Sequence, residues 1–562
     1  MARAYLGRYS TSDNSRVAEI QAAHDKLFSE PPRMVALDIE SPSTTDDRPL
    51  GIGISNFQGD AFYYDIFDAS LPWHLVWPSA TTKVWQNGTF DLQPSALGKF
   101  GADIENIEDT ILLARLAGIP ASLVDCCEYL QTQHRPENMG TVLRRHGVKK
   151  VTELPWEVVA QKCMTDVLGT AESFDIMYPQ RHQERYGVEI SITRLLLSMS
   201  KIGLKIDQDR LGAIDAELEQ NEKLYIGTAK SFGFNPLSPS EVAFSLMDEG
   251  EWVPFKNGRP NTEADVLEQM SHPWAALTLL ARKYNKLHST YSHKFLGQDR
   301  AHSRFSISAS TLRIASADVN LQNIPTGGRR GDIIPKAGRI RSIFVPDEDV
   351  FTIADMGQIE LRVLAHLSGD LVMQDILNDR TRTKANDIHG LTVARWNLPR
   401  VAAKNLNFGM AYGGDLPALS KPTGIKDFAM LAAFREDWFT QYQFVRRWIE
   451  DQQYIGLRDL EVETLFGQKL KLLQGHQDRG NISEKHIKNM AVNFPIQGSA
   501  AEIFKRALLE IIKHVPVEQL LLQVHDEIMM NGRHVLDWDE MSHMFDFWTP
   551  WEIDNPTRWE KD

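Results

Sequence analysis

The chain has 562 residues, of which 42% are hydrophobic and 24% are charged, and its formal net charge is −14 at pH 7. This is the composition of an ordinary soluble protein. The length exceeds what one hydrophobic core supports, so we expect three or four domains or subdomains.

Secretion and membrane insertion are not indicated. The N-terminal segment MARAYLGRYSTSDNSRV has no apolar core, and no apolar run approaches the length of a membrane span. The three cysteines, Cys126, Cys127 and Cys163, have no zinc-type spacing, and adjacent cysteines rarely form a disulfide. We therefore expect a reducing compartment, a cytoplasmic or nucleoid-associated location and no membrane partner.

The acidic balance argues mildly against a nucleic-acid partner, because phosphate contacts need Lys and Arg. Net charge is not charge distribution, however, and acids gathered in metal sites leave a local basic groove intact. Solvated faces explain the basic residues equally well when no motif is considered. The basic segments are 185–194, 281–294, 327–341, 379–384 and 399–404.

Residues 34–186 alternate strand-like and helical segments, which predicts an α/β domain. The strand-like segments are MVALDIE, LGIGISN, AFYYDIF and KVWQNGT, followed by a predicted helix, IEDTILLARLAG, at 107–118.

Asp38 and Glu40 lie two residues apart on the first of these strands, so their side chains point to the same side. Two like charges on one face need a counter-ion, and a metal ion is the natural one. A solvent-facing pair at a sheet edge is the alternative. Asn87 and Asp91 in VWQNGTFDL and Asp166 in CMTDVLGTAESF supply further polar groups in the same domain.

Residues 187–300 are mostly helical by periodicity. We expect the domain boundary near YPQRHQERYGVE, residues 178–189, where the helix-rich sequence begins. No internal repeat or low-complexity segment is present.

Two carboxylates lie at the ends of apolar strands in the C-terminal half. The strand VFTIA ends at Asp355 and is followed by a predicted helix, while Asp526 interrupts the apolar hairpin LLLQVHDEIMM. Burying a charge costs several kcal/mol unless it is paired or bound to a metal. Two such carboxylates can hold two divalent ions about 3.5–4 Å apart. An N-cap role is the alternative for Asp355.

Arg400, Lys404, Phe408 and Tyr412 recur every four residues in LPRVAAKNLNFGMAYGG, so one helix face carries two cations and two aromatic rings. This pattern suits a nucleoside triphosphate with a stacked base. Alternatively, the rings belong to the core and the cations are solvated.

Three of these segments, DMGQIELR, RVAAKNLNFGMAYG and VHDE, resemble motifs A, B and C of the family A DNA polymerases, the DNA polymerase I type. Their order and spacing agree with that family, and STLRIASADVNLQNIP and VNFPIQGSAAEIFKRAL extend the resemblance. The resemblance covers nearly all of the chain from about residue 187. It implies an α+β right-hand fold with the thumb at 187–300, the palm at 301–375 and 486–562, and the fingers and a connecting segment at 376–485.

The N-terminal pattern D-x-E, N-x3-F-D and a final aspartate resembles the DEDD-type 3′–5′ exonuclease of the same polymerases, an α/β domain of the ribonuclease H-like kind, here at 1–186. The resemblance assigns Asp38, Glu40, Asp91 and Asp166 to catalysis and metal binding. The family's tyrosine falls on Lys162, which can hold a phosphate or hydroxide instead. We expect an active exonuclease with an altered rate. Only residues 1–33 precede the first strand, so no 5′-nuclease domain is expected ahead of it.

In the polymerase domain the resemblance assigns metal binding to Asp355, Asp526 and the carbonyl of Met356. Glu527 is expected beside the primer terminus, and Lys404 is the best candidate to protonate the pyrophosphate. The resemblance implies nucleotide binding by Arg400, Lys404, Phe408, Tyr412, Glu360, Gln358 and His389, with Glu360 excluding a 2′-hydroxyl. It implies DNA binding by Arg313, Asn493, Gln497, His525, Gln322 and Asn323.

Several positions depart from the family pattern. Met356 and Gly357 replace the family's Tyr and Ser, Gln468-Lys469 replaces Arg-Arg, and Lys488-Asn489 replaces Glu-Arg. The segment before Arg400 is also short, which predicts a trimmed fingers tip. These departures bear on primer–template contacts and leave the metal ligands unchanged.

The resemblance implies a template-directed DNA polymerase with proofreading, which we expect to come from a bacteriophage and to act as a monomer on primer–template DNA and dNTPs. It implies two Mg²⁺ ions at each site, with Mn²⁺ as a substitute, and helicase, primase and single-strand-binding protein as partners. A preference for 2-aminoadenine over adenine is a further hypothesis. The alternatives are a single-subunit RNA polymerase, against which Glu360 argues, and an inactive DNA-binding protein.

Overall fold

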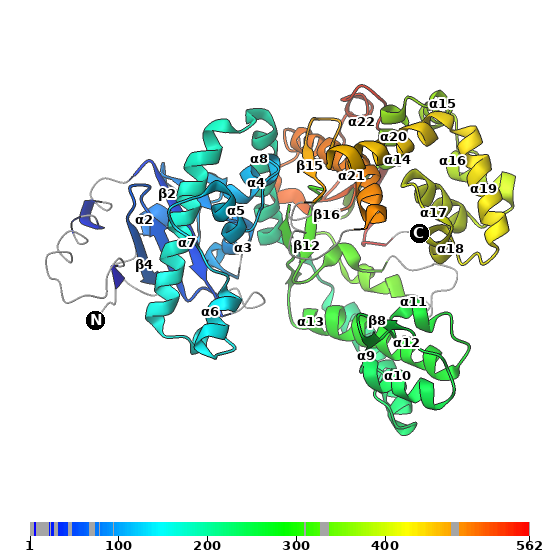
Figure 1. Ribbon diagram of the computed structural model, residues 1–562, viewed down its shortest axis with the longest axis horizontal. Coiled ribbons are helices and arrows are strands. Elements are labelled where there is room, and N and C mark those ends of the chain that lie inside the picture. The colour runs from blue at the N-terminus through cyan, green and yellow to red at the C-terminus, as the bar shows by residue number, and fades with distance from the viewer. Residues whose placement is uncertain are drawn as a thin grey trace.

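The computed structural model describes residues 5–6, 22, 24–26, 32–42, 48–66, 73–77, 79–93, 95–307, 311–325, 337–473 and 483–560. An α/β unit built by the N-terminal part lies at one end of the elongated molecule, and green and yellow helical units project from a central region at the other (Figure 1). Of the predicted basic segments, residues 327–336 fall outside the described residues.

The N-terminal unit is built on a six-stranded mixed sheet with the order β1-β4-β3-β2-β5-β6. Strands β2, β3 and β4 form an antiparallel meander, and β5 and β6 continue the sheet parallel to β2. The α/β prediction for this region is therefore confirmed. The strands are β1 (Tyr5–Leu6), β2 (Met34–Glu40), β3 (Gly51–Ser55), β4 (Ala61–Asp65), β5 (Thr82–Trp85) and β6 (Ile107–Asp109).

The helix predicted at 107–118 was wrong in its first turn. Residues Ile107–Asp109 form β6, and α4 (Thr110–Leu116) starts only after them. The Asp109 carboxylate accepts the backbone N–H of Ile111 at 2.9 Å, so it ends the strand and caps the helix at the same point. The other helices of this unit are α2 (Trp73–Val76), α3 (Gly88–Asp91), η1 (Leu97–Phe100), α5 (Leu123–Leu130), α6 (Met139–His146), η2 (Val151–Glu153), α7 (Trp156–Met177) and η3 (Tyr178–Gln180).

Helix α8 (Gln183–Ile202) joins the N-terminal unit to the rest of the molecule. Its Glu189 carboxylate accepts from Lys505 Nζ at 2.7 and 2.8 Å, and both side chains are almost completely buried. The predicted boundary at residue 186 falls inside this helix, so a division at 181–182 keeps the helix whole.

The thumb is helical, as predicted, and has a small core of its own around Phe234, Val242 and Leu246. Its long helices α9 and α12 pack against each other. The elements are β7 (Leu204–Lys205), α9 (Gln208–Ser231), α10 (Pro239–Asp248), β8 (Phe255–Lys256), β9 (Arg259–Pro260), α11 (Ala264–Leu267), α12 (Pro273–Leu287), the π-helical turn η4 (His288–Ser292), α13 (His293–Phe295) and β10 (Arg300–Ala301).

The palm contains a four-stranded antiparallel sheet with the order β16-β17-β13-β18. The predicted hairpin and the predicted strand are both confirmed, although the strand runs one residue beyond Asp355 to Met356, whereas the edge strand β18 was not predicted. The palm elements are β11 (Arg304–Ser306), β12 (Ala315–Ala317), η5 (Leu321–Asn323), η6 (Ala337–Ile343), β13 (Phe351–Met356), α14 (Ile359–Ser368), α15 (Leu371–Asn378), α21 (Glu484–Ile511), η7 (Val517–Gln519), β16 (Leu520–Val524), β17 (Glu527–Asn531), α22 (Trp538–Met541) and β18 (Trp551–Asp554).

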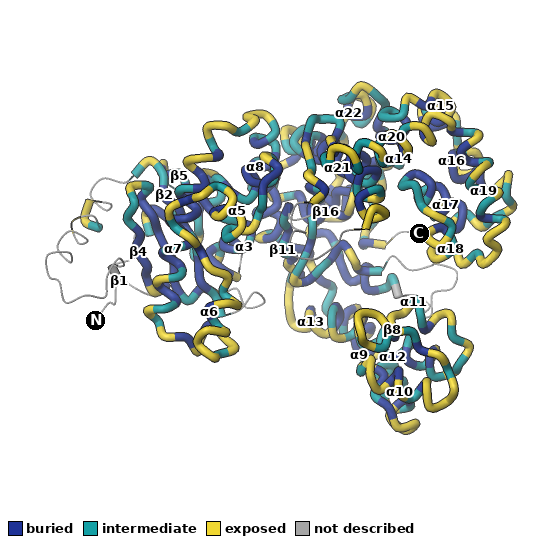
Figure 2. The backbone as a smooth tube through the Cα atoms, in the orientation of Figure 1, coloured by how far each residue is buried: buried dark blue, intermediate teal, exposed yellow. Residues whose placement is uncertain are grey.

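The fingers are a helical unit, and most of their residues are exposed or half-buried. Buried residues concentrate in the palm and the N-terminal sheet (Figure 2). No helix in the described ranges has the length and apolar character to cross a membrane. All three cysteines are buried free thiols. The elements here are α16 (Ile388–Trp396), α17 (Arg400–Ala411), α18 (Leu416–Thr423), α19 (Phe428–Gln441), α20 (Gln443–Asp459), β14 (Glu461–Glu463) and β15 (Lys469–Lys471).

Candidate active sites

Asp355 and Asp526 lie side by side on the palm sheet. Asp355 is on β13, opposite Glu527 on β17, and Asp526 is in the turn that leads into β17. The N–H of Met356 donates to the carbonyl of Asp526 at 2.9 Å, which holds the turn against the end of β13. Burial, and next the charge of Asp355, raise the pKa of Asp526 to about 7. The structure therefore brings the two predicted carboxylates into one electrostatic site.

The tight turn places its two acids, Asp526 and Glu527, in different surroundings. His525 has a φ of 58°, the left-handed conformation that short hairpin turns use. Asp526 borders the cavity described below, whereas the buried Glu527 lies near Arg341. Burial lowers the pKa of Arg341 to about 10, and the charge of Glu527 opposes this shift. Of the two acids, Asp526 is the one that faces the open site.

A cavity of about 310 Å³ lies beside these carboxylates. Its walls come from α14, α17, α21, the hairpin turn and the segment before β12, which are far apart in the sequence. Seven of the predicted site residues border it: Arg313, Gln358, Glu360, Lys404, Phe408, His525 and Asp526.

Glu360 is held by two partners at the cavity. The hydroxyl of Tyr412 donates to Glu360 Oε2, and Arg313 pairs with Glu360 Oε1. Burial raises the pKa of Tyr412 to about 12, so its hydroxyl remains a donor at neutral pH. The three side chains form a rigid polar group where a nucleotide sugar is expected.

Arg400 is engaged by a residue that we did not predict. Its guanidinium makes a bidentate pair with Asp387, with Nη1–Oδ1 and Nη2–Oδ2 distances of 2.9 and 2.5 Å. Although burial alone would raise it, this pair holds the pKa of Asp387 below its usual value. Asp387 also caps α16 by accepting the N–H of Gly390 at 2.7 Å. The available signal was an aspartate, a common N-cap residue, directly before the segment IHGLTVARW. Lys404, one turn further along α17, is exposed.

Two predicted ligand contacts lie behind the surface. His389 is 2% exposed, its Nδ1 is 3.0 Å from Asn407 Nδ2, and burial lowers its pKa to about 4. Gln322 is 9% exposed, and its amide donates to Gln523 Oε1 at 2.8 Å. Asn323, in contrast, is exposed. His389 and Gln322 are thus buried and hydrogen bond to other side chains of the protein. Their direct contacts with nucleotide or DNA stay predictions.

Asn493 and Gln497 project from α21, one turn apart. Asn493 Oδ1 is buried and has no hydrogen-bond partner among the described residues. Gln497 hydrogen bonds to the Tyr412 side chain. The helix thus places the amide of Gln497 against Tyr412, and the DNA contacts of both residues stay predictions.

The four N-terminal carboxylates converge as predicted. Asp38 and Glu40 lie on β2, Asp91 ends α3, and Asp166 lies on α7, which packs on β2. Asp91 Oδ1 accepts the N–H of Ile39 at 3.2 Å. Burial, and next the charges of Asp166, Asp91 and Glu40, raise the pKa of Asp38 well above its usual value, and burial raises that of Asp91 to about 8.

Lys162 lies inside this cluster, which differs from our expectation that it is available for a phosphate or hydroxide. Its Nζ donates to Glu40 Oε1 at 2.9 Å and to Asp166 Oδ2 at 2.5 Å. Although burial alone would lower it, Glu40 and Asp166 hold the pKa of Lys162 well above its usual value. The physical reason is that uncompensated buried charges cost several kcal/mol each, so the ammonium group is drawn to the carboxylates.

Cys163, which we had not linked to this cluster, donates its thiol to Asp38 Oδ2 at 3.5 Å. Beside Lys162, a cavity of about 410 Å³ is bordered by Arg135, Arg145 and His146 and also by Glu137 and Glu157, so its wall carries both signs of charge. Arg145 is paired with Glu137.

The palm residues fit divalent cations. Burial, and next the charge of Asp355, raise the pKa of Asp526, so the two carboxylates repel each other in a buried site, and the nearby guanidinium of Arg313 pairs with Glu360. The N-terminal residues fit divalent cations in part. Asp38, Glu40 and Cys163 place ligand atoms within 4.8 Å of one another, but Lys162 already uses one oxygen each of Glu40 and Asp166.

Residues 208–543, more than half of the chain, match the model of the family described as DNA polymerase family A. The chain belongs to DNA polymerase family A. The matched range contains both palm carboxylates and the whole of α17, so the sequence resemblance on motifs A, B and C is confirmed.

Relatives of this family A member include the thermostable DNA polymerase I of Thermus filiformis, which is 35% identical over 373 residues, 61% of this chain and 43% of that protein. The DNA polymerase I of Chloroflexus aurantiacus is 29% identical over 493 residues, 80% of this chain and 50% of that protein. The chain thus spans half or less of these relatives.

The POL domain of Pol1 from M. smegmatis, solved in complex with DNA primer-template and dNTP, has the same fold as this family A member. The TM-score is 0.70 at 23% identity, over 97% of this chain and 98% of that one. The right-hand fold is therefore confirmed, and the likeness also extends over the N-terminal α/β unit.

Proposed function

We propose that this chain is a template-directed DNA polymerase whose reaction takes place at Asp355 and Asp526. The observation that carries the proposal is the pairing of these two carboxylates beside a cavity that Lys404, Phe408 and Glu360 also border. Its relatives of Thermus filiformis and Chloroflexus aurantiacus are named DNA polymerase I, and the M. smegmatis complex contains primer-template and dNTP, which supports the same proposal.

In this proposal, Lys404 binds the triphosphate and protonates the leaving pyrophosphate, and Phe408 stacks on the incoming base. Glu360, fixed by Tyr412 and Arg313, fills the space that a 2′-hydroxyl would need. Mg²⁺ ions held by Asp355, Asp526 and the carbonyl of Met356 would activate the primer hydroxyl and neutralise the leaving group.

Arg400 has to exchange partners in this mechanism. Its bidentate pair with Asp387 uses the same planar donors that suit a phosphate. A triphosphate therefore competes with the Asp387 carboxylate, and nucleotide binding releases α17 from the start of α16.

Primer extension with the purified chain tests the proposal. Asp526→Asn should lower the rate about 1,000-fold, because it removes several kcal/mol of charge stabilisation. Asp554→Asn, an exposed carboxylate on β18 of the same sheet, is the matched control and should keep full activity. No extension by the wild type, or equal extension by Asp526→Asn, would contradict the proposal. Ribonucleotide incorporation at similar rates would favour an RNA polymerase.

We also propose a 3′–5′ exonuclease activity in the N-terminal unit, carried by Asp38, Glu40, Asp91 and Asp166. The convergence of four carboxylates beside a cavity that Arg135 and His146 border supports it. Mg²⁺ held by Asp38 and Glu40 would activate the attacking water. Lys162 supplies a fixed positive charge within the cluster, and we expect this charge to slow the reaction by competing for Glu40 and Asp166.

Cleavage of single-stranded DNA by the wild type, with Asp38→Ala as the inactive control, tests the second activity. We expect slow cleavage by the wild type and none by the variant. Equal, negligible cleavage by both proteins would contradict the exonuclease proposal and leave the polymerase proposal untouched.

A further inference from the structure

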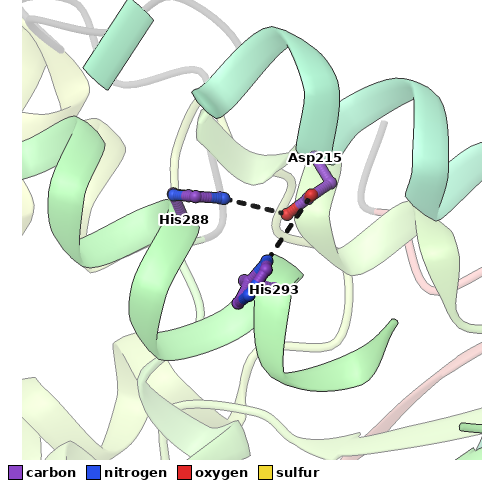
Figure 3. Close-up of side chains that lie close together, drawn as sticks. All are labelled: Asp215, His288 and His293. Carbon is purple, nitrogen blue, oxygen red and sulfur yellow. Dashed lines mark ion pairs between the residues drawn. The ribbon is translucent and has the colours of Figure 1, made fainter. Parts of the chain in front are cut away.

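A third cluster of potential metal ligands lies in the thumb. Asp215 is on α9, His288 begins the π-helical turn η4, and His293 begins α13 (Figure 3). His288 Nε2 is 3.4 Å from Asp215 Oδ1, and His293 Nδ1 is 3.9 Å from Asp215 Oδ2. One ligand atom from each residue lies within 4.8 Å of the other two.

The π-helical turn is what brings the two histidines together. The N–H of His293 donates to the carbonyl of His288, five residues earlier. In an α-helix, side chains four residues apart share a face, and one additional residue per turn gives that relation to residues five apart. Both rings are drawn toward the Asp215 carboxylate in Figure 3. Such turns are rare and occur frequently at functional sites.

A second set of contacts orients the ligands. Nδ1 of His288 hydrogen bonds to Glu222, whose other oxygen accepts from Asn285 Nδ2 at 2.5 Å. The hydroxyl of Ser292 donates to Asp215 Oδ1 at 2.6 Å. Metal-binding histidines commonly donate their second nitrogen to a carboxylate in this way, which leaves the first nitrogen as a lone-pair ligand.

This arrangement leaves two acceptors facing each other. If His288 Nδ1 carries the ring proton and donates it in a hydrogen bond to Glu222, His288 Nε2 presents a lone pair to Asp215 Oδ1 at 3.4 Å. Nε2 is buried and makes no hydrogen bond within the described part of the chain. A cation between the two atoms turns this repulsion into attraction. The cation is either a metal ion or a second proton on His288, and the test below separates them.

We propose that Asp215, His288 and His293 form a binding site for a divalent transition-metal ion, with Zn²⁺ as the best match. Two imidazoles and one carboxylate suit Zn²⁺, whereas Mg²⁺ prefers oxygen ligands. Three protein ligands leave a fourth position, which opens toward solvent on the side of the exposed His293.

A bound ion would join α9 to the junction of α12 and α13. The same junction contacts the palm, because the Tyr291 hydroxyl donates to the carbonyl of Asn323 at 3.2 Å. Binding to the folded state alone stabilises it by mass action. The expected consequence is a thumb held more firmly at its base. The site shares no residue with either carboxylate site, so it does not depend on the proposed activities.

Titration of the full, chelator-treated chain with Co²⁺ as a spectroscopic probe, and with Zn²⁺ in thermal unfolding, tests the proposal. His293→Ala is the informative variant, because the side chain is exposed and its loss leaves the core intact. His543→Ala is the matched control, since His543 is also exposed and lies 4.0 Å from a carboxylate, that of Asp539.

We expect the wild type and His543→Ala to bind one more tight equivalent of Co²⁺ than His293→Ala, with visible absorption of a nitrogen-ligated ion. Ions bound by the palm and N-terminal carboxylates are present in all variants, so they do not contribute to the difference in Co²⁺ stoichiometry. Glu222→Gln should weaken this site about 10–100-fold without abolishing it.

Identical Co²⁺ stoichiometry and spectra in the wild type and His293→Ala would overturn the proposal and assign the second proton to His288. A Zn²⁺-induced rise in unfolding temperature that His293→Ala retains would overturn it equally. Loss of both signals in His293→Ala alone would support it.

Discussion

The palm and the N-terminal unit each gather carboxylates, but they balance the charge differently. In the palm, no Lys or Arg of the described chain forms an ion pair with Asp526, and the nearby Arg313 pairs with Glu360. In the N-terminal unit, Lys162 lies between Glu40 and Asp166. The N-terminal cluster therefore carries part of its counter-charge in the chain, whereas the carboxylate of Asp526 in the palm is not paired with a described Lys or Arg.

The comparison teaches that an intact set of acids does not define a metal site by itself. All four N-terminal acids are present and converge, yet an ammonium group uses oxygens that a metal ion needs. The difference is due to Lys162, which lies four positions before Asp166 on the same face of α7.

The largest expected effect is on stability. Lys162→Met should lower the free energy of unfolding by about 3–5 kcal/mol in chelator, because it leaves buried carboxylates without their partner. Chemical denaturation measures it, and added Mg²⁺ should restore part of the loss. Lys469→Met, which removes an exposed pair with Glu461, is the control and should cost less than about 1 kcal/mol. Equal losses in the two variants would contradict the assigned role of Lys162.

A second prediction concerns the buried imidazole of His389 beside Phe408, where the effect of burial outweighs the opposing charge of Asp387. Its pKa in the folded protein, about 4, lies below the unfolded value of 6.5, so the unfolded state binds the proton more readily. The stability that the neutral ring contributes is present above pH 6.5 and is lost as the pH falls toward 4. Between pH 7 and 4 the wild type should lose on the order of 3 kcal/mol more than His389→Asn. Parallel pH profiles in denaturation would rule this out.

A third prediction exchanges the counter-charge for the family's residue. Lys162→Tyr frees Glu40 and Asp166 and supplies a hydroxyl that can orient water, so single-strand cleavage should rise about tenfold or more. The double variant Asp38→Ala, Lys162→Tyr controls for a contaminating nuclease. A slower or unchanged rate would show that Lys162 does not limit the site.

The smallest expected effect is in the fingers. Asp387→Asn keeps an N-cap on α16 but removes the charge that pairs with Arg400. The triphosphate then competes with a weaker partner, so the KM for dNTP should fall about threefold with kcat nearly unchanged. Asp415→Asn is matched, because Asp415 also caps a helix and pairs with an exposed lysine, Lys485. A similar change in both variants would assign the effect to capping instead.

Local patterns were enough to predict many elements. Apolar runs predicted β13 and the β16–β17 hairpin, and the four-residue spacing predicted α17 with its stripe from Arg400 to Tyr412. These features depend on residues close in sequence, where periodicity and turn preferences act directly. Strand β6 was misread as helix because its three residues are too few to show a period.

By itself, the sequence determined the family, the two sets of carboxylates and the elements that carry them. The tertiary structure alone decided how those charges are balanced. Lys162 reaches Glu40 across 122 positions, Arg400 turns to Asp387, and a π-helical turn aims two histidines at Asp215. The physical reason is that a buried charge takes the nearest compensating group in space, and only the packing of distant elements sets which group that is.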